Sequence, residues 1–273
     1  MRDKVVVITG ASGGIGAALA TRVGALGGRL VLAARREPEL RAVAASCDTH
    51  AVVVAADVTR RADVQRILDA ALSRLRHVDV WVNNAGRGIT RRVSELSDED
   101  FDEMMLVNVK SALYGMQAVL PHFRERRRGH IINVSSMLGR VPFAPFRSAY
   151  SAAKHALNAL TANLRMELAA AYPDIHVTTV SPGVVATDFG LQALGGGPDS
   201  RTLPLAQPPE EVAEVIVDVI EHPRADVYTR PGMRELVVAY YGAEDMAAVE
   251  AQSPIAPGVS TSSTPPGTPA PSG

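Results

Sequence analysis

The sequence predicts an α/β protein with a doubly wound fold, in which a single parallel sheet of six to seven strands carries helices on both faces. Short runs that are apolar throughout alternate with longer helical patterns, and this alternation is typical of strands buried on both sides. The first run, Val5–Thr9, leads directly into a glycine-rich turn and a helix, as in other doubly wound folds. The sequence shows no internal repeat, so a solenoid is not predicted.

Strands are expected where apolar, mostly β-branched residues run without interruption. They cover Val5–Thr9, Arg29–Ala34, Ala51–Ala55, Val78–Asn83, Ile131–Ser135, Ile175–Ser181 and, where a seventh strand forms, Asp226–Thr229. Helices are expected between them, where apolar residues recur with a helical period. They cover Gly14–Leu26, Glu39–Ser46, Ala62–Leu75, Asp98–Arg126, Tyr150–Tyr172 and Glu210–Glu221. Ser97 and Asp100 are typical of a capping box at the start of the longest helix.

Composition narrows the class of protein. The chain has 273 residues and a formal net charge of −1, which does not favour nucleic acid or an anionic membrane as a partner. Its single cysteine, Cys47, cannot form an internal disulfide, and this indicates a reducing compartment. No stretch reaches about 18 uninterrupted apolar residues, and the N-terminal apolar run is too short for a signal peptide. We therefore expect a cytoplasmic protein with no membrane partner.

Two segments depart from the alternating pattern. Residues 189–209 are rich in Gly and Pro, and a loop of that length inside a compact domain is usually functional, so we expect a substrate loop there. Residues 251–273 consist mostly of Pro, Ser, Thr and Gly and are expected to form a disordered tail. Residues 1–250 are then expected to form a single domain.

The turn after the first strand predicts a site for phosphate groups. Its glycines are spaced Gly10-x3-Gly14-x-Gly16, and glycines let the backbone turn sharply and approach a pyrophosphate closely. The N-terminus of the following helix offers free N–H groups and a positive dipole to the same phosphates. A merely tight strand–helix turn is the alternative interpretation.

The end of the second strand indicates which dinucleotide binds. NAD-binding folds place an acidic residue there to hold the ribose 2′-hydroxyl, but this strand ends in Ala34-Arg35-Arg36. A guanidinium matches a 2′-phosphate in charge and geometry, so the sequence favours NADP(H). At the end of the third strand, Asp57 and Val58 are candidates for the adenine, although an Asp at this position also caps helices well.

Tyr150 and Lys154 are the strongest candidates for chemistry. Residues four apart lie on the same face of a helix, and a nearby cation lowers the pKa of a phenol, which is ordinarily about 10. Such a phenol can protonate a forming alkoxide or take the proton back. An ordinary helical pair without a chemical role is the alternative. Ser135 and Ser136 end the fifth strand, where a hydroxyl can hydrogen-bond a substrate oxygen.

Three further groups of residues are candidates because of their position. Asn84, Ala85 and Gly86 end the fourth strand, where small residues let a cofactor lie against the backbone. Asn108 lies inside the longest predicted helix, where Asn is a poor helix former, which suggests either a function or a buried, satisfied side chain. The segment from Pro182 to Thr187 follows the sixth strand and can hold the nicotinamide carboxamide.

Taken together, these segments resemble the short-chain dehydrogenase/reductase family, from about residue 3 to about residue 235. The resemblance implies a Rossmann-type fold and an NADP-preferring oxidoreductase that interconverts a carbonyl group and an alcohol. The motifs that carry it occur in the family's order and spacing: Gly10-x3-Gly14-x-Gly16, Asn83-Asn84-Ala85-Gly86, Asn108, Ser136, Tyr150-x3-Lys154 and Pro182-Gly183-x3-Thr187.

The resemblance also implies roles for individual residues. Tyr150 is similar to the family's acid/base, and Lys154 resembles the lysine that binds the nicotinamide ribose and lowers the tyrosine pKa. Ser136 looks like the serine that steadies the substrate oxygen, and Asn108 like the asparagine of a proton relay through water. The implied cofactor-binding residues are Gly10, Ser12, Gly14, Ile15, Gly16, Arg35, Asp57, Val58, Asn84, Ala85, Gly86, Tyr150, Lys154, Pro182, Gly183, Val185 and Thr187.

One departure from the family concerns the substrate. The interval from Ser136 to Tyr150 is one residue longer than the family's commonest interval, and the segment 137–149 lines the substrate side in relatives. Phe143, Phe146 and the loop 189–209 favour a largely apolar pocket, which suits hydrophobic ketones, aldehydes or alcohols, with 3-oxoacyl thioesters as an alternative. Arg147 and Arg201 are the only candidates for anion binding in these segments, and we interpret both as surface charges.

Two expectations concern function class and assembly. A catalytically silent NADP-binding sensor of the same fold is the rival to an enzyme, because fold alone does not separate them. The seven histidines show no close metal-ligand spacing, so no metal is predicted. Small and apolar residues on the two longest predicted helices favour a homodimer or homotetramer, as is frequent in the family.

Overall fold

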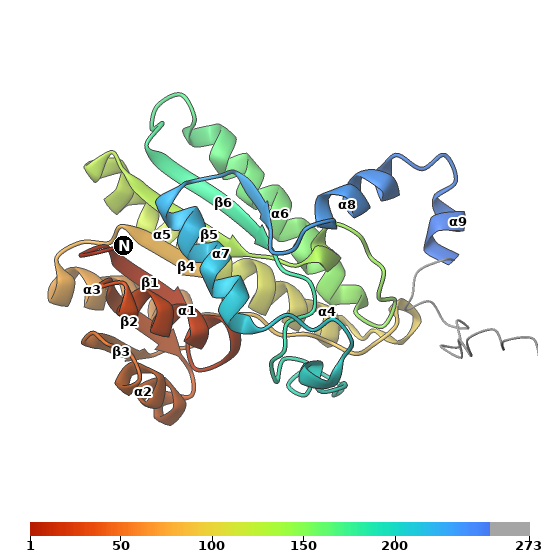
Figure 1. Cartoon of the computed structure of the whole chain (residues 1–273), viewed down its shortest axis with the longest axis horizontal. Helices are drawn as coiled ribbons and strands as arrows, with labels where there is room; N and C mark the ends of the chain where they lie inside the picture. The colour runs from red at the N-terminus through yellow and green to blue at the C-terminus, as the bar shows by residue number, and fades with distance from the viewer. Residues whose placement is uncertain (252–273) are drawn as a thin grey trace, which may run out of the picture.

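Seven parallel strands form one sheet in the computed structural model, which describes residues 1–251 (Figure 1). Their order is β3-β2-β1-β4-β5-β6-β7, and all neighbours run parallel. The six expected strands and the optional seventh are all present, so the predicted fold class is confirmed. The strands are β1 (Val5–Thr9), β2 (Arg29–Ala34), β3 (Ala51–Ala55), β4 (Val80–Asn83), β5 (Gly129–Val134), β6 (Ile175–Ser181) and β7 (Asp226–Tyr228).

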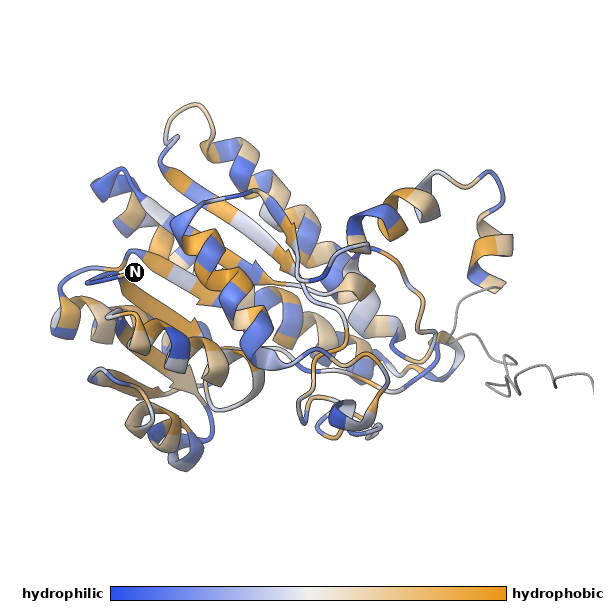
Figure 2. Ribbon diagram, viewed as in Figure 1, coloured by the Kyte–Doolittle hydropathy of each residue, from blue (hydrophilic) through white to orange (hydrophobic). Residues whose placement is uncertain are grey.

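Helices cover both faces of the sheet and bury one core on each side. On one face, α1 (Gly14–Ala25), α2 (Glu37–Ala45) and α7 (Pro209–Glu221) pack on the strands. On the other face lie α3 (Arg61–Leu75), α5 (Ser111–Arg126) and α6 (Ser148–Leu168). Figure 2 shows β1 and β2 mostly in hydrophobic colours, whereas β5 and β6 include paler, polar positions. Burial on both faces explains why β1 and β2 carry apolar side chains on both sides rather than alternating.

The order of the strands reverses beside β1. From β1 the chain builds outward through β2 to β3, and then crosses to the other side of β1 to add β4 and the remaining strands. In open α/β sheets, ligands bind outside the carboxyl ends of the strands at such a reversal. The predicted phosphate turn follows β1, and the predicted small residues follow β4, so both lie at this point.

The longest predicted helix is interrupted in the structure. Residues Asp98–Arg126 form α4 (Asp98–Met105), a π-helical segment over Leu106–Lys110, and then α5. Ser97 caps α4, since its Oγ accepts a hydrogen bond from Asp100 N at 3.2 Å. The π-helical segment contains Asn108, and π-turns of this kind are frequent at functional sites. The prediction of one continuous helix was therefore wrong at Asn108, the residue that forms helices poorly.

The remaining differences concern helix ends and the C-terminal part. Helix α6 begins at Ser148 rather than Tyr150 and ends at Leu168 rather than Tyr172. Two short helices, α8 (Met233–Tyr241) and α9 (Met246–Ala251), were not predicted, and Figure 1 shows them projecting beyond the sheet. The predicted tail lies outside the described residues except for Ala251, which ends α9.

No helix within residues 1–251 is long and apolar enough to cross a membrane.

Candidate active site

The glycine turn forms a cradle at the N-terminus of α1. Gly10 and Gly14 have positive φ angles of 67° and 53°, which other residues adopt only with strain. A Cβ atom on Gly16 would lie 2.4 Å from the carbonyl oxygen of Gly10, so no larger residue fits there. No side chain caps α1, which leaves its first backbone N–H groups available to an anion. The residues present therefore fit the pyrophosphate of a dinucleotide.

The ends of β4 and β6 close around this cradle. Asn84 Nδ2 donates hydrogen bonds to the carbonyl oxygens of Thr9 (2.9 Å) and Gly10 (3.2 Å) and so fixes the turn to the end of β4. A Cβ atom on Gly14 would lie 3.1 Å from Thr187 Cγ2, which brings the segment after β6 to the same place. The chain thus brings together predicted cofactor-binding residues from three separate segments.

Of the two arginines after β2, Arg36 is the one that contacts the glycine turn. Its Nη2 donates to the carbonyl oxygen of Ser12 at 3.4 Å and to Ser12 Oγ at 3.3 Å, and the guanidinium also lies 3.7 Å from Glu39. Arg35 is exposed. The sequence analysis assigned the 2′-phosphate to Arg35 and left Arg36 out of the site, although the pair of arginines was the signal that pointed to both.

Asp57 takes part in a local turn after β3. Its Oδ1 accepts hydrogen bonds from Thr59 N (3.0 Å) and Thr59 Oγ1 (2.7 Å), and Val58 packs against the core between α3 and α5. The turn is therefore fixed by the carboxylate itself. The adenine contacts expected of Asp57 and Val58 stay predictions.

The four predicted catalytic side chains are all buried, with exposed fractions between 1% for Asn108 and 8% for Ser136. Ser136 follows β5, where its Oγ accepts a hydrogen bond from Leu138 N at 3.1 Å, while Tyr150 and Lys154 lie on α6. Gly86 joins the group: a Cβ atom there would lie 2.9 Å from Asn108 Oδ1 and 3.6 Å from Lys154 Nζ. The structure thus brings these predicted residues into one buried cluster.

The pKa of the Tyr150 phenol is shifted by other groups than the sequence suggested. Burial raises the pKa of Tyr150 to about 12, whereas a hydrogen bond with Ser136 and the charge of Arg147 lower it. Lys154 is not among the groups that shift this pKa. Its Nζ lies 5.7 Å from the Tyr150 ring centroid and donates to the carbonyl oxygen of Val134 at 2.9 Å. Burial also lowers the pKa of Lys154, to about 8.

The Asn108 side chain is fully occupied by backbone groups. Its Nδ2 donates to the carbonyl oxygens of Arg87 (2.9 Å) and Met104 (3.1 Å), and its Oδ1 accepts from Arg87 N at 3.2 Å. The side chain therefore holds the segment after β4 against the π-helical segment. Of the two interpretations left open by the sequence, the buried and satisfied side chain describes this geometry.

Arg147 corrects the sequence interpretation of the substrate side. It was taken as a surface charge, but only 8% of it is exposed, because it lies directly before α6 with its guanidinium against Gly88 and against Gly197 of the loop 189–209. Arg201 does lie at the surface, where it forms an ion pair with Asp199 at 2.7 Å. The burial of Arg147 depends on segments distant in sequence, so the local pattern carried no signal for it. The Phe189 ring also packs on Tyr150, with centroids 5.5 Å apart.

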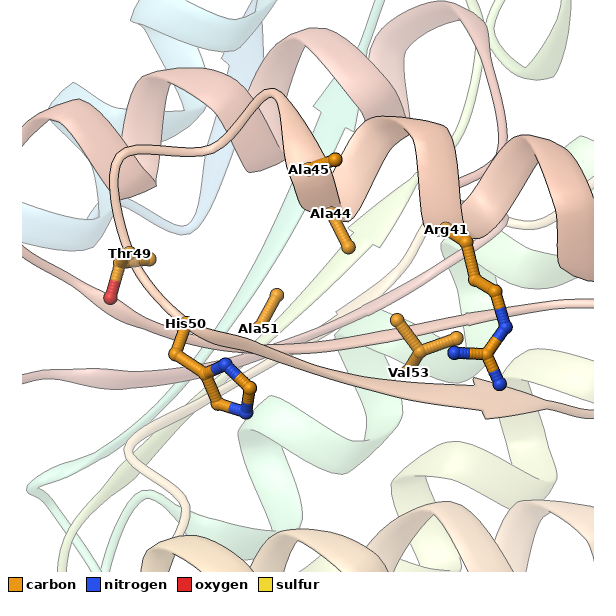
Figure 3. A pocket seen from close by; sticks show the side chains of 7 residues that line it. All are labelled: Arg41, Ala44, Ala45, Thr49, His50, Ala51 and Val53. Carbon is orange, nitrogen blue, oxygen red and sulfur yellow. The ribbon is translucent and has the colours of Figure 1, made fainter.

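Two pockets elsewhere on the surface contain none of the predicted site residues. Figure 3 shows one of about 270 Å³ between α2 and β3, lined by Arg41, Ala44, Ala45, Thr49, His50, Ala51 and Val53. A larger one of about 1120 Å³ lies beside α6, with Glu250 and Ala251 of α9 on its wall. The first lies apart from the cluster around Tyr150, whereas the second is lined by Phe143 of the segment 137–149 and by Ser151, the residue next to Tyr150.

Comparison with known protein families matches residues 4–193 to the short chain dehydrogenase family. The chain belongs to this short-chain dehydrogenase/reductase family. An uncharacterized oxidoreductase of Staphylococcus epidermidis is 38% identical to it over 196 residues, which are 70% of this chain and 84% of that protein. The chain is therefore an oxidoreductase of a family whose members bind a nicotinamide cofactor.

Solved structures agree with this assignment. A short chain dehydrogenase/reductase from Burkholderia phymatum in complex with NAD has a TM-score of 0.81 at 27% identity, covering 88% of this chain and 94% of that one. An alcohol dehydrogenase from the archaeon Thermococcus sibiricus complexed with 5-hydroxy-NADP has a TM-score of 0.72 at 30% identity, covering 83% and 95% respectively. The two differ in cofactor type, so the likeness itself does not select NAD or NADP.

Proposed function

We propose that this short-chain dehydrogenase/reductase is an NADP(H)-dependent enzyme that interconverts a ketone or aldehyde and the corresponding alcohol. The observation that carries the proposal is that Ser136 and Tyr150 are both buried beside the carboxyl end of β5, where Ser136 is close enough to lower the pKa of Tyr150. When bound along the crevice, the nicotinamide supplies or accepts the hydride. The chain's own residues then have to hold the substrate oxygen and move one proton.

Tyr150 and Ser136 divide that work. Two neighbouring hydroxyl groups can both contact one carbonyl oxygen, which fixes its position as charge develops on it. A phenol with a pKa of about 12 stays protonated near neutral pH, so Tyr150 is ready to donate in the reductive direction. The resulting phenolate is stabilised by the hydrogen bond with Ser136 and by the charge of Arg147.

Lys154 and Asn108 hold the surroundings of this pair. Lys154 Nζ and Asn108 Oδ1 both face the position beside Gly86 where no Cβ atom intervenes, which suits a close approach of the nicotinamide ribose. Lys154 is fixed to Val134 on β5, and Asn108 is fixed to Arg87 after β4. Both residues therefore act at the junction of the two strands that border the crevice.

The preference for NADP(H) rests on the two arginines after β2. No acidic residue ends this strand to accept a bond from a ribose 2′-hydroxyl, and Arg36 already lies against Ser12 of the glycine turn. Two guanidinium groups at this position attract a 2′-phosphate and would leave an unmodified ribose without a carboxylate partner. The homodimer or homotetramer expected from the sequence belongs to the same proposal, as does the single domain over residues 1–250.

Substitution of Tyr150 by Phe tests the proposed chemistry. We expect the purified chain to oxidise NADPH with a panel of carbonyl compounds, and Tyr150→Phe to lower kcat by about 10³-fold, since general acid catalysis supplies about 10²–10⁴-fold. NADPH affinity, measured by fluorescence titration, should stay within about twofold. NADPH binding by the wild type without turnover of any compound would favour the silent sensor instead.

A further inference from the structure

Arg147 is a buried cation without a carboxylate partner in the described part of the chain. Its guanidinium donates from Nη1 to the carbonyl oxygen of Ile89 at 3.1 Å and lies 5.4 Å from the Phe146 ring centroid. None of the ion pairs within residues 1–251 includes it. Burial of a charge costs free energy unless an opposite charge compensates it. A partner of opposite charge from outside the chain would supply that compensation.

The neighbouring residues leave room for this guanidinium. A Cβ atom on Gly88 would lie 2.9 Å from Nη1, and one on Gly197 would lie 3.2 Å from Nη2. The same point beside Gly197 is also 3.2 Å from Thr90 Oγ1. The Thr90 hydroxyl is enclosed and has no hydrogen-bond partner among the described residues. Two polar groups thus converge at one place, and neither has found a full set of partners within the protein.

This place adjoins the proposed reacting group. Arg147 is the residue directly before α6, whose first turn contains Tyr150, and its charge acts on the Tyr150 phenol. The Phe189 ring connects the two: it packs on Tyr150 with centroids 5.5 Å apart, and its Cε1 lies 2.9 Å from the Cβ position of Gly88, as Arg147 Nη1 does. Arg147 and Thr90 therefore lie between the segment after β4, the loop 189–209 and Tyr150, on the substrate side.

We propose that Arg147 and Thr90 bind a carboxylate of the substrate, so that the enzyme acts on short oxo acids and the corresponding hydroxy acids. A guanidinium and a hydroxyl match the two oxygens of a carboxylate. In reduction, the carbonyl carbon gains a hydride from the reduced nicotinamide and its oxygen gains the proton of Tyr150, so the substrate is reduced and the cofactor oxidised. The carboxylate is unchanged. This inference rests on the proposed function, and it replaces the largely apolar substrate expected from the sequence with an anionic one.

Matched pairs of acid and ester test this site in the full-length enzyme with NADPH. Acetoacetate is compared with methyl acetoacetate, and 2-oxobutanoate with methyl 2-oxobutanoate. We expect kcat/KM of the wild type to favour at least one acid over its ester by about tenfold or more, because the ester removes the charge that Arg147 would pair. The acid-to-ester ratio is the readout, since it cancels any effect of Arg147 on Tyr150 that both substrates share.

Three variants locate the effect. Arg147→Met should reduce the ratio to about one. Thr90→Val keeps the shape of the side chain and removes a hydroxyl without a protein partner, so it should fold normally and lower the ratio by about threefold or more. Arg201→Met is the matched control, because Arg201 is an exposed arginine of the loop 189–209 that pairs with Asp199; its ratio should equal that of the wild type.

The outcomes separate this inference from the proposed function. Turnover of acids and esters with equal kcat/KM, or a ratio that neither Arg147→Met nor Thr90→Val changes, overturns the carboxylate site and leaves the oxidoreductase proposal standing. Turnover of no compound contradicts the proposed function. Carboxylate binding is then measured by calorimetry on the NADP⁺-loaded chain: binding of 2-oxobutanoate that Arg147→Met abolishes supports the site, and no binding overturns it.

Discussion

The crevice at the carboxyl ends of the strands has a phosphate end and a reacting end, and the two differ in the chemical groups that line them. The phosphate end consists of backbone groups, namely glycines with positive φ angles and an uncapped helix N-terminus, together with two exposed arginine side chains. The reacting end consists of side chains that expose 8% or less of their surface. Exposed charges are screened by water and salt, whereas buried ones change pKa values and folding free energy strongly. The difference implies that one end sets cofactor affinity and the other sets chemistry and costs stability.

Substitution of one serine at each end compares the two ends directly. The largest loss of kcat is expected at the reacting end. Ser136→Ala removes the hydroxyl that lowers the pKa of Tyr150 and should lower kcat by about 10²–10³-fold, as loss of one oxyanion donor does. Ser12→Ala removes a hydroxyl at the glycine turn and should raise the NADPH Kd severalfold with kcat unchanged at saturation. Steady-state kinetics with both substrates varied measures each effect. Equal losses of kcat in both variants would contradict the division.

Lys154 offers a test of the stability cost at the reacting end. Burial lowers its folded pKa to about 8 from its usual 10.5, so the charged lysine costs folding free energy in full below pH 8, and the cost shrinks as pH rises toward 10.5. Lys154→Met should therefore be more stable than the wild type at pH 7 although it is inactive. That advantage should fall by about 2 kcal/mol between pH 7 and pH 9.5.

Urea unfolding of the cofactor-free proteins at both pH values measures the Lys154 effect. Lys110, a lysine of the π-helical segment that is exposed, provides the matched control, because Lys110→Met removes the same charge without relieving burial. An equal difference in the free energy of unfolding between Lys154→Met and the wild type at both pH values would show that burial of the Lys154 ammonium does not destabilise the folded protein.

The two arginines give the smallest expected effect. Arg36→Ala should lower the ratio of NADPH to NADH efficiency by about tenfold, near 1.4 kcal/mol, since a charge-assisted hydrogen bond at an exposed site contributes about that much. Arg35→Ala should lower it less, because only Arg36 lies against Ser12. The measurement is kcat/KM for both cofactors at low salt. A native enzyme that uses NADH and NADPH equally would contradict the preference.

Local patterns were sufficient for most of the fold. The strand that became β1 and the turn after it were predictable because apolar runs and glycine spacings are set by neighbouring residues. The cap at Ser97 was predictable for the same reason. The interruption at Asn108 was not, because the π-turn depends on the backbone of Arg87, which lies 21 residues away in the chain. Helices α8 and α9 were missed because short helices carry little periodic signal.

The sequence by itself determined the α/β class, the order of the strands and the glycine turn after β1, since each depends on periodicity and spacing along the chain. It did not reveal the positions of Arg36 and Arg147. Only the tertiary structure decided how the residues of the crevice act on one another. It buried Tyr150, which raises the phenol pKa, brought Ser136 and Arg147 near enough to lower that pKa, and directed Lys154 to Val134. Burial and charge depend on what folds over a residue, and the loop that covers Arg147 is 40 or more residues away in sequence.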